Sequence, residues 1–313
     1  PVFTFSWSPD HVMSRNYVGD IYLVRAAKIP LDFISACRPP HWRYALLLHL
    51  GNHSDKIHRV ASILWSAPPL PGEILERRLR DESAVIEKYL SRLEPLANLT
   101  VVDGQRYIEW PIAGEPRVSI IIPTMAKLDL IKSCLDSLTA ITAYKNYEIL
   151  MLDNSRGRNP EGIAYLHDRK FEVIECDEAF NWARLNNIGA RHSKADYLLF
   201  LNDDIEITDA KWLHELLRHA MRPEVGTVGG LLLYPNGAIQ HAGVFIVNFG
   251  GGCAHLFHKM MPNKKIYRRL DRTVREVAAS TGACLMLSRE KFEAVGCFDE
   301  ELAVVGNDID LSL

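Results

Sequence analysis

Blocks of apolar residues alternate with amphipathic stretches between residues 118 and 233 of this chain. The apolar runs have the length of buried strands and lack a polar face, which is typical of a parallel sheet covered on both sides. This order of strands and helices predicts an α/β fold with a mostly parallel central sheet and right-handed crossovers. The predicted strands are Val118–Pro123, Tyr147–Asp153, Phe171–Cys176 and Tyr197–Leu201, followed by the apolar run Val225–Leu233. The predicted helices are Leu128–Thr139, Glu161–His167, Asn181–His192 and Lys211–His219.

Polar residues directly follow three of these strands. Since the carboxyl ends of parallel strands meet at one edge of a sheet, where ligands bind in open α/β folds, we expect these residues to converge. Carboxylate and amide oxygens suit a hard divalent cation, which can bridge a carboxylate and a diphosphate. The alternative is that these residues start helices or turns, where Asn and Asp are also common. The three clusters are Pro123-Thr124, Asp153-Asn154-Ser155 and Asn202-Asp203-Asp204.

A second set of candidate residues lies in the glycine-rich stretch Tyr234–His258. His241, His255 and His258 could ligate a metal, although histidines in loops more often lie at the surface or support a site. Beyond this stretch, Ala279–Leu287 predicts one more buried strand.

Two acids close the chain. Asp308 and Asp310 would share a face on a strand but diverge on a helix, where only one of them could point into a site. The alternative is a cluster of acids at the start of a helix, because apolar residues follow at once.

Composition narrows the class of protein. The 313 residues are 48% hydrophobic and 24% charged, as in a soluble globular protein with a sizeable core. The formal net charge of −3 gives no reason to expect binding to nucleic acid. No apolar run reaches the length that crosses a bilayer. The six cysteines form no CxxC pair, which favours reduced thiols and a cytoplasmic location over disulfides or a zinc site.

Three common motifs are absent from the sequence. The first crossover reads Pro123-Thr124-Met125-Ala126 instead of G-x-G-x-x-G, which argues against a dinucleotide fold for hydride transfer. The chain also has no P-loop sequence and no G-x-S-x-G elbow.

Several segments, in this order, resemble the inverting family 2 glycosyltransferases, which have the GT-A fold. The resemblance runs from about residue 118 to residue 313, and it is closest to the subgroup that builds rhamnose-containing and other bacterial surface polysaccharides. The matching segments are VSIIIPT, MLDNS, FNWARLNNIGA, YLLFLNDD, QHAGV, TGACLMLSRE and NDIDLSL.

The resemblance implies a Mn²⁺ or Mg²⁺ ion and a catalytic carboxylate. The family's metal-binding D-x-D motif falls on Asn202-Asp203-Asp204, so Asn202 replaces its first acid and Asp204 becomes the expected direct ligand. The acidic pair before the acceptor helix falls on Asn307-Asp308, and Asp308 is then the expected general base.

The resemblance also implies a binding site for the nucleotide-diphosphate sugar. Asp153 matches the residue that contacts the nucleobase. Arg184 could meet the diphosphate, although such an arginine more often pairs with a surface acid. Asn187 is expected to be a buried amide in need of partners. The full expected donor site is Pro123, Thr124, Asp153, Asn154, Arg184, Asn187 and Asp203.

The first part of the chain predicts a different arrangement. Residues 1–76 suggest a strand after residue 16, an apolar helix at RYALLLHLG and another strand at HRVASILWSAP. This order resembles the C-terminal part of a second, similar domain. An offset of 263 positions aligns Gly19 with Gly282 but places Ala45 opposite Asp308, so this upstream unit would lack the base. The alternative is an unrelated α/β cap.

We therefore expect three segments. Residues 1–76 would be the remnant of an upstream glycosyltransferase-like domain, and residues 77–116 a linker helix with short strands. Residues 117–313 would be a GT-A domain truncated at its C-terminus. Because the chain starts at Pro1 and stops inside an apolar pattern, we expect it to belong to a longer polypeptide.

The leading functional hypothesis is transfer of a sugar, with dTDP-rhamnose as a candidate donor, to a growing glycan or lipid-linked glycan. Peripheral association with the cytoplasmic face of the inner membrane would suit such an acceptor. A nucleotidyltransferase is a rival hypothesis. Such an enzyme requires a Gly- and Arg/Lys-rich loop after the first strand, and Met125-Ala126-Lys127 is a poor version of it. A non-catalytic carbohydrate-binding or scaffold domain is the rival from another class, and the retained Asp204 and Asp308 argue against it.

Overall fold

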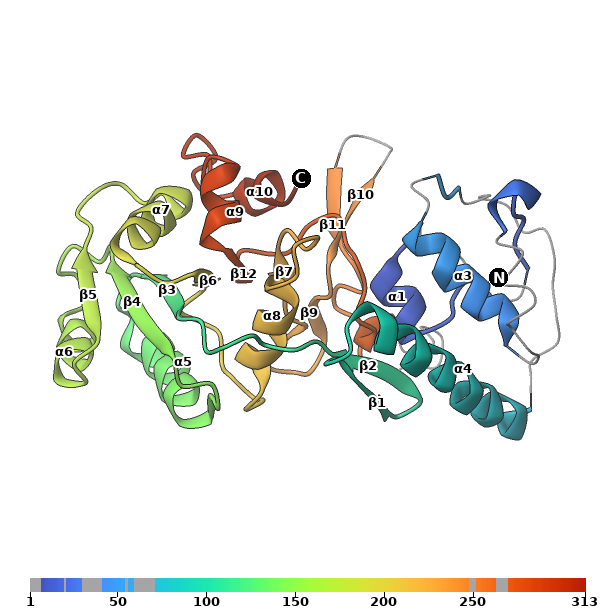
Figure 1. Cartoon of the computed structure of the whole chain (residues 1–313). Coiled ribbons are helices and arrows are strands. Elements are labelled where there is room, and N and C mark those ends of the chain that lie inside the picture. The colour runs from blue at the N-terminus through green and yellow to red at the C-terminus, as the bar shows by residue number, and fades with distance from the viewer. Residues whose placement is uncertain are drawn as a thin grey trace. The chain divides into compact units, whose positions relative to one another are not determined.

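The chain forms two compact units (Figure 1). The computed structural model describes residues 7–19, 21–29, 41–53, 56–58, 71–247, 252–262 and 270–313. Unit 1 comprises residues 1–111 and 265–276, and unit 2 comprises residues 112–264 and 277–313. No helix among the described residues is both long and apolar enough to span a membrane.

Unit 2 contains a six-stranded sheet in the order β5-β4-β3-β6-β12-β7. Neighbouring strands among β3, β4, β5 and β6 pair in parallel, whereas β12 runs antiparallel to both β6 and β7. The predicted α/β fold with a mostly parallel sheet is therefore confirmed. The strands are β3 (Val118–Thr124), β4 (Tyr147–Asp153), β5 (Glu172–Glu175), β6 (Tyr197–Leu201), β7 (Val228–Gly229) and β12 (Cys284–Ser288).

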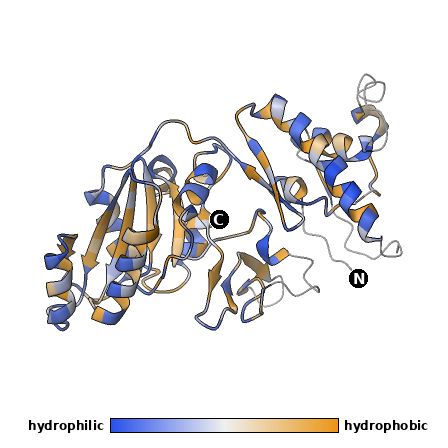
Figure 2. Ribbon diagram, turned by 90° about the horizontal axis from the view of Figure 1, so that it is seen from below, coloured by the Kyte–Doolittle hydropathy of each residue, from blue (hydrophilic) through white to orange (hydrophobic). Residues whose placement is uncertain are grey.

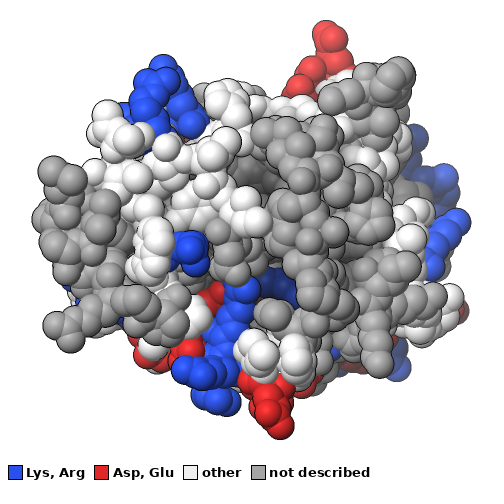
Figure 3. Space-filling model, turned by 90° about the vertical axis from the view of Figure 1, so that its right-hand side faces the viewer, with Lys and Arg blue, Asp and Glu red and all other residues white. Residues whose placement is uncertain are grey.

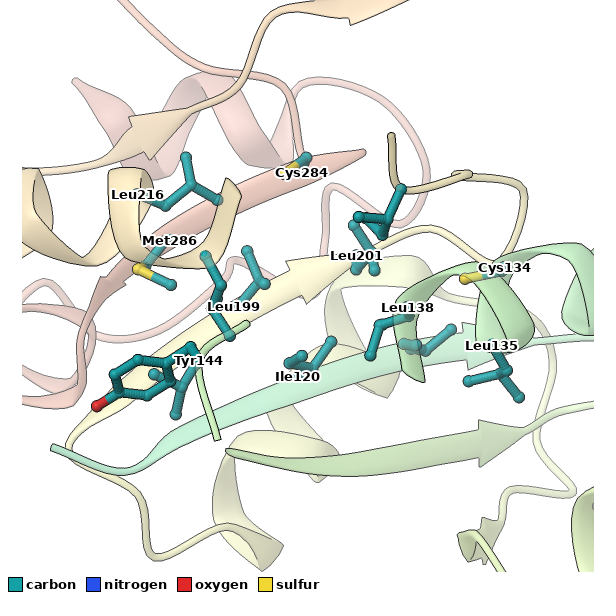
Figure 4. Packing of buried hydrophobic residues seen from close by; sticks show 14 of the residues in the cluster. Ile120, Cys134, Leu135, Leu138, Tyr144, Leu199, Leu201, Leu216, Cys284 and Met286 are labelled. Carbon is teal, nitrogen blue, oxygen red and sulfur yellow. The ribbon is translucent and has the colours of Figure 1, made fainter. Parts of the chain in front are cut away.

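Helices cover both faces of this sheet, which explains the apolar runs. Alternate residues of one strand enter different cores: on β6, Leu199 joins one cluster (Figure 4) and Phe200 the other. Figure 2 shows these strands coloured mainly as hydrophobic. The helices whose residues join the first cluster are α5 (Leu128–Ile141), α6 (Pro160–Asp168) and α8 (Trp212–Ala220). The helices of the second cluster are α7 (Trp182–His192), α9 (Arg289–Ala294) and α10 (Asn307–Ser312).

Two small hairpin-like pairs lie beside the sheet in unit 2. The apolar run after α8 splits between β7 and β8 instead of forming one strand. The second apolar run, Ala279–Leu287, yields a strand only from Cys284 onward. The pairs are β8 (Leu232–Leu233) with β9 (Ile239–His241), and β10 (Val244–Val247) with β11 (Gly252–His255).

The described residues of unit 1 form three α-helices and a β-hairpin. The predicted apolar helix is confirmed as α3, but residues 21–25, where a strand was expected, form none. Most of the second expected strand, HRVASILWSAP, lies outside the described residues. The elements are α1 (Pro9–Ser14), α3 (Trp42–Asn52), α4 (Gly72–Leu93), β1 (Asn98–Val102) and β2 (Gln105–Glu109), with short 3₁₀ turns at Ala26–Lys28 and Leu270–Arg272.

Helix α4 is part of the core of unit 1. Its Ile86 and Leu90 are fully buried together with Val12, Tyr44 and Ile108. We expected a solvated linker helix because charged residues dominate its sequence. One apolar face is enough to bury this helix, and it lies within unit 1, whose first segment extends to residue 111. The predicted origin of residues 1–76 stays a prediction.

Candidate functional site

The polar strand ends meet where the order of the sheet reverses. From β3 the chain adds β4 and β5 on one side, and then crosses to place β6 on the other side. Pairing of β3 with β6 stops at Ile121 and Phe200, while pairing with β4 continues to Thr124 and Asp153. Ligands of open α/β sheets bind in the crevice that opens at such a switch point.

A proline is compatible with position 123, where β3 has separated from β6. The Asn154 N–H donates to the Thr124 carbonyl at 2.9 Å, so residue 124 bonds toward β4 and residue 123 faces the β6 side. A proline lacks an N–H, but the ladder with β6 has already ended here, and no sheet hydrogen bond is lost.

Side chains from the three strand ends come together as predicted. The Thr124 hydroxyl donates to the Asp203 carboxylate at 2.6 Å. Asp153 is the register partner of Thr124, and its Oδ1 accepts the Ser155 N–H at 2.8 Å. Asn154 donates its amide hydrogens to the carbonyls of Cys176 and Glu178, so it holds the loop after β5. Asp153 and Thr124 are only 6% and 4% exposed, which leaves little room for alternative positions.

The loop after β3 is held rigidly beside this cluster. Ala126 has a positive φ of 53°, and its N–H donates to the Thr124 hydroxyl at 2.9 Å. A Cβ added to Gly162 of α6 would lie 1.9 Å from the Ala126 carbonyl oxygen, so only glycine permits this approach. Asn159 donates to the Met125 carbonyl at 2.7 Å. These contacts fix the strained turn, a feature that often accompanies function.

The two acids after β6 have different surroundings. Asp203 is half-buried and bonded to Thr124, whereas Asp204 is exposed. Burial raises the pKa of the Asp203 carboxyl, the Thr124 hydrogen bond opposes this shift, and the negative charge of Asp204 adds to it. A bound cation would relieve this concentration of negative charge.

The residues fit a divalent cation that is shared with a ligand. Asp203 and Asp204 supply oxygen atoms, the donors that Mg²⁺ and Mn²⁺ prefer. In the part of the chain that the structure describes, no three His, Cys, Asp or Glu side chains are grouped so as to hold a metal alone. A site of this kind fits an ion that takes one or two carboxylates and completes its coordination with phosphate oxygens.

Asn202 faces a tryptophan that the sequence analysis did not single out. The Trp182 indole N–H donates to the Asn202 side-chain oxygen at 3.2 Å. Because that oxygen already serves as an acceptor, Asp204 is better placed than Asn202 as a direct metal ligand. The signal in the sequence was a tryptophan at the start of a helix, since a buried indole N–H requires an acceptor.

Trp182 also supports the loop that holds Asp308. A Cβ added to Gly282 would lie 2.6 Å from the Trp182 ring, so the backbone of residue 282 rests against the indole. The Gly282 N–H donates to Asp308 Oδ2 at 2.9 Å, and the Ile309 N–H donates to Oδ1 at 2.9 Å. Both carboxylate oxygens are therefore oriented. Asp310 lies on the same helix, α10, but is exposed, so the two acids diverge as expected for a helix.

Two residues of the expected donor site have protein partners instead. Arg184 lies 2.9 Å from Glu178 and 3.6 Å from Glu300, the surface ion pairs considered as the alternative. Asn187 donates to the Phe298 carbonyl and to Glu300, and accepts the Phe298 N–H at 3.1 Å. Asn187 therefore anchors α7 to the segment after α9. A diphosphate contact by Arg184 would require its ion pairs to open.

The three histidines form two pairs near the same region. His241 Nδ1 lies 2.8 Å from His255 Nδ1, and His258 Nε2 lies 2.9 Å from the Tyr234 hydroxyl. His241 is buried, whereas His255 and His258 are exposed. The sequence analysis left open whether these histidines ligate a metal, lie at the surface or support a site, and the sequence gave no indication of this pairing.

Comparison with known sequences identifies the family. The model of the family described as "Glycosyl transferase family 2" matches residues 119–296, more than half of the chain. The chain belongs to glycosyltransferase family 2. It is 34% identical to the O-antigen biosynthesis protein RfbC of Myxococcus xanthus over 328 residues, which cover 100% of this chain. It is also 34% identical to the protein y4gI of Sinorhizobium fredii over 333 residues, covering 99% of this chain.

This family 2 chain spans only part of those relatives, 25% of RfbC and 36% of y4gI. Among solved structures it resembles GalNAc-T7, crystallised with UDP, GalNAc and Mn²⁺, with a TM-score of 0.51 and 15% identity. The alignment covers 78% of this chain and 49% of that one. At this level of identity the resemblance supports the GT-A fold alone.

Proposed function

We propose that this chain is an inverting glycosyltransferase that moves a sugar from a nucleotide-diphosphate sugar to a growing bacterial surface glycan. The observation that carries the proposal is the convergence of Thr124, Asp153 and Asp203 at the switch point of a family 2 fold. The similarity to an O-antigen protein supports the acceptor class. dTDP-rhamnose is the proposed donor, on the resemblance of the motifs alone.

The proposed donor site extends along the carboxyl ends of β4, β3 and β6. Asp153 and Asn154 would face the nucleoside, while Thr124 would orient Asp203. Asp204, with Asp203, would hold Mn²⁺ or Mg²⁺, and Asn202 would support them from its bond to Trp182. When bound, such an ion stabilises the negative charge on the leaving diphosphate.

Asp308 is the proposed general base. Inverting transfer is a single displacement: the acceptor oxygen bonds to the anomeric carbon as the bond to the diphosphate breaks. The acceptor hydroxyl must lose its proton in this step, and a carboxylate can accept it. The N–H groups of Gly282 and Ile309 fix both carboxylate oxygens of Asp308, so its position is set before an acceptor arrives.

Substitution of Asp308 tests the function. Asp308→Asn should keep the hydrogen bond from Gly282 and the affinity for donor, but lose ~10²–10⁴-fold in turnover, because the amide cannot accept the proton. Asp310→Asn is the matched control and should change turnover little, since Asp310 is exposed. The measurements are transfer to the acceptor and calorimetric donor affinity for each variant. Normal turnover in Asp308→Asn would place the base elsewhere.

The proposed place of action is the cytoplasm, at a membrane-bound acceptor. All five described cysteines are free thiols: Cys134, Cys176, Cys253, Cys284 and Cys297. On the face shown in Figure 3, basic and acidic side chains of the described residues are interspersed. We propose that contact with the membrane runs through a lipid-linked acceptor.

A further inference from the structure

The hydrogen bonds of the pair His241–His255 favour one arrangement of protons. The Gly243 N–H donates to His241 Nε2 at 3.2 Å, so this nitrogen is an acceptor and carries no proton. A neutral His241 must then carry its proton on Nδ1. That nitrogen lies 2.8 Å from His255 Nδ1, so His241 donates and His255 accepts. Since His255 Nδ1 is an acceptor, the proton of neutral His255 sits on Nε2.

This tautomer gives His255 an outward hydrogen-bond donor. His255 ends strand β11 and is exposed, while its partner His241 on β9 is only 2% exposed. The buried ring therefore acts as a fixed support for the exposed one.

His255 also lies on the side of the fold that holds the proposed general base. It pairs with Val244 of β10, and Val244 bridges to Ala279, three residues before the Gly282 that donates to Asp308. Partial burial of the ring, the largest effect, and the neighbouring His258 lower the pKa of His255 below its usual value, and the negative charge of Asp308 opposes this shift. The ring is therefore neutral at physiological pH. Among the described residues, the titratable groups around His255 are His241 on β9, His258 in the turn after β11 and Asp308 on α10.

We propose that His255 donates a hydrogen bond from Nε2 to a hydroxyl of the acceptor sugar, and that His241 is the positioning residue that fixes this tautomer. The inference rests on the proposed function. The hydroxyl that attacks gives its proton to Asp308, while His255 binds another hydroxyl of the same sugar. No proton leaves His255 in the reaction.

The arrangement predicts a dependence on pH. Protonated His255 would carry a hydrogen on Nδ1 that faces the Nδ1–H of His241, and the pair would separate. Acceptor binding should therefore weaken as the pH falls through the pKa of His255, and be fully present above it.

The experiment measures acceptor KM with the nucleotide sugar that the wild-type protein uses, found in a panel of UDP-, GDP- and dTDP-sugars with Mn²⁺. The acceptors are octyl glycosides of rhamnose, mannose and galactose. His255→Phe should raise the KM for the glycoside about tenfold, the effect of one lost hydrogen bond. His255→Gln should recover part of this loss, because its amide N–H can replace Nε2–H, and its KM should not depend on pH.

His258→Phe is the matched control. This ring lies in the turn after β11, with its centroid 6.0 Å from that of His255. Phenylalanine keeps an aromatic ring there and removes the bond to Tyr234, while the contact between the two Nδ1 atoms of His241 and His255 remains. Its KM should stay near that of the wild type. Donor affinity should be unchanged in all three variants.

A second measurement concerns the tautomer itself. ¹⁵N NMR of the wild-type protein should show His255 protonated on Nε2, and His241→Phe should give a mixture of tautomers with a raised acceptor KM. If His241 had only a structural role, its substitution would not change the tautomer of His255. A His255 protonated on Nδ1, an unchanged KM in His255→Phe, or a loss of donor affinity in that variant would each overturn the inference. A wild-type protein that transfers to none of the glycosides would instead overturn the proposed function, and the inference with it.

Discussion

Neighbouring acids of the strand-end cluster differ in what holds them. The hydroxyl of Thr124 orients Asp203, while Asp204 is exposed and is free to meet a ligand's cation. We predict that Asp204→Ala removes metal-dependent nucleotide binding, whereas Asp203→Ala weakens it less. Calorimetry with UDP, GDP and dTDP, each with and without Mn²⁺, measures both effects. Equal affinity of Asp204→Ala and the wild type in Mn²⁺ would rule out the role of Asp204.

A buried histidine in unit 1 should make this unit sensitive to acid. His11 is fully buried and stacks on Tyr17, with ring centroids 4.3 Å apart. Burial, together with the charges of Arg275 and Arg15, lowers the pKa of His11 to about 4. The unfolded state then binds a proton more readily than the folded state. Stability is complete above the ordinary pKa of histidine, near 6.5, and is lost as the pH falls toward 4.

The expected loss of stability on acidification follows from the ordinary pKa of histidine and the lowered pKa of His11. Between pH 7 and pH 5 His11 should cost about 2 kcal/mol of unfolding free energy. His11→Phe keeps a ring against Tyr17 and should show a smaller loss over the same range. Urea unfolding at both pH values measures the difference. The raised pKa of Glu276 acts in the opposite direction in both proteins, so it cancels in the comparison. Identical pH dependence in the two proteins would refute the role of His11.

At the scale of elements, a buried ion pair joins the pieces of unit 1. Arg106 of β2 is 1% exposed and lies 3.2 Å from Glu82 of α4. Its guanidinium also donates to the carbonyl of Met13 in the last turn of α1 and to the Tyr44 hydroxyl of α3. Arg78 lies 2.8 Å from the second oxygen of Glu82. Arg106 thus connects its own strand to three helices that are far apart in the sequence.

Substitutions of Glu82 and of Arg106 should lower the free energy of unfolding by different amounts. Glu82→Leu leaves the buried Arg106 charge with neutral partners only and should cost ~3–5 kcal/mol. Arg106→Met leaves Glu82 paired with Arg78 and should cost less. The double variant should be destabilised by less than the two single losses combined. Urea unfolding of all four proteins completes the cycle. Strictly additive losses would show that the pair is not coupled.

The sequence predicted those elements whose structure depends on the local pattern of apolar and polar residues. The strand VSIIIPT and its polar neighbours could be recognised because a buried parallel strand is a continuous apolar run. The partners of Asn187 could not be recognised from the sequence, because Phe298 is 111 positions away. The antiparallel direction of β12 could not be predicted either, since an apolar run does not reveal in which direction the strand pairs. The site was therefore predictable at strand ends, and not where Asn187 of α7 bonds to the segment after α9.

At the scale of the whole molecule, both units occur together in relatives. The matches to RfbC and y4gI cover 100% and 99% of this chain, so unit 1 has counterparts in both proteins. The proposal that residues 1–76 derive from a second glycosyltransferase domain remains a prediction. The offset of 263 positions places α10 within α3, but it places β12 on residues 21–25, which form no strand.

The last prediction concerns the segment 265–276, which is remote in sequence but belongs to unit 1. Glu276 accepts hydrogen bonds from the Asp10 N–H, at 2.9 Å, and from the Ser8 hydroxyl at the start of α1. The Tyr107 hydroxyl of β2 donates to the Arg272 carbonyl at 3.4 Å. A fragment of residues 1–111 lacks these partners, and the first N–H groups of α1 lose their acceptor.

We therefore expect residues 1–111 alone to unfold at a clearly lower urea concentration than the same residues joined to 265–276 through a glycine-serine linker. Glu276→Ala in the joined fragment should remove most of the gain, because Ser8 and Asp10 then lose the carboxylate. Circular dichroism during urea unfolding compares the three fragments. Equal midpoints for all three would mean that the segment lies on unit 1 without stabilising it. A gain that survives Glu276→Ala would assign the stabilisation to the remaining contacts of the segment, such as that of Tyr107 with Arg272.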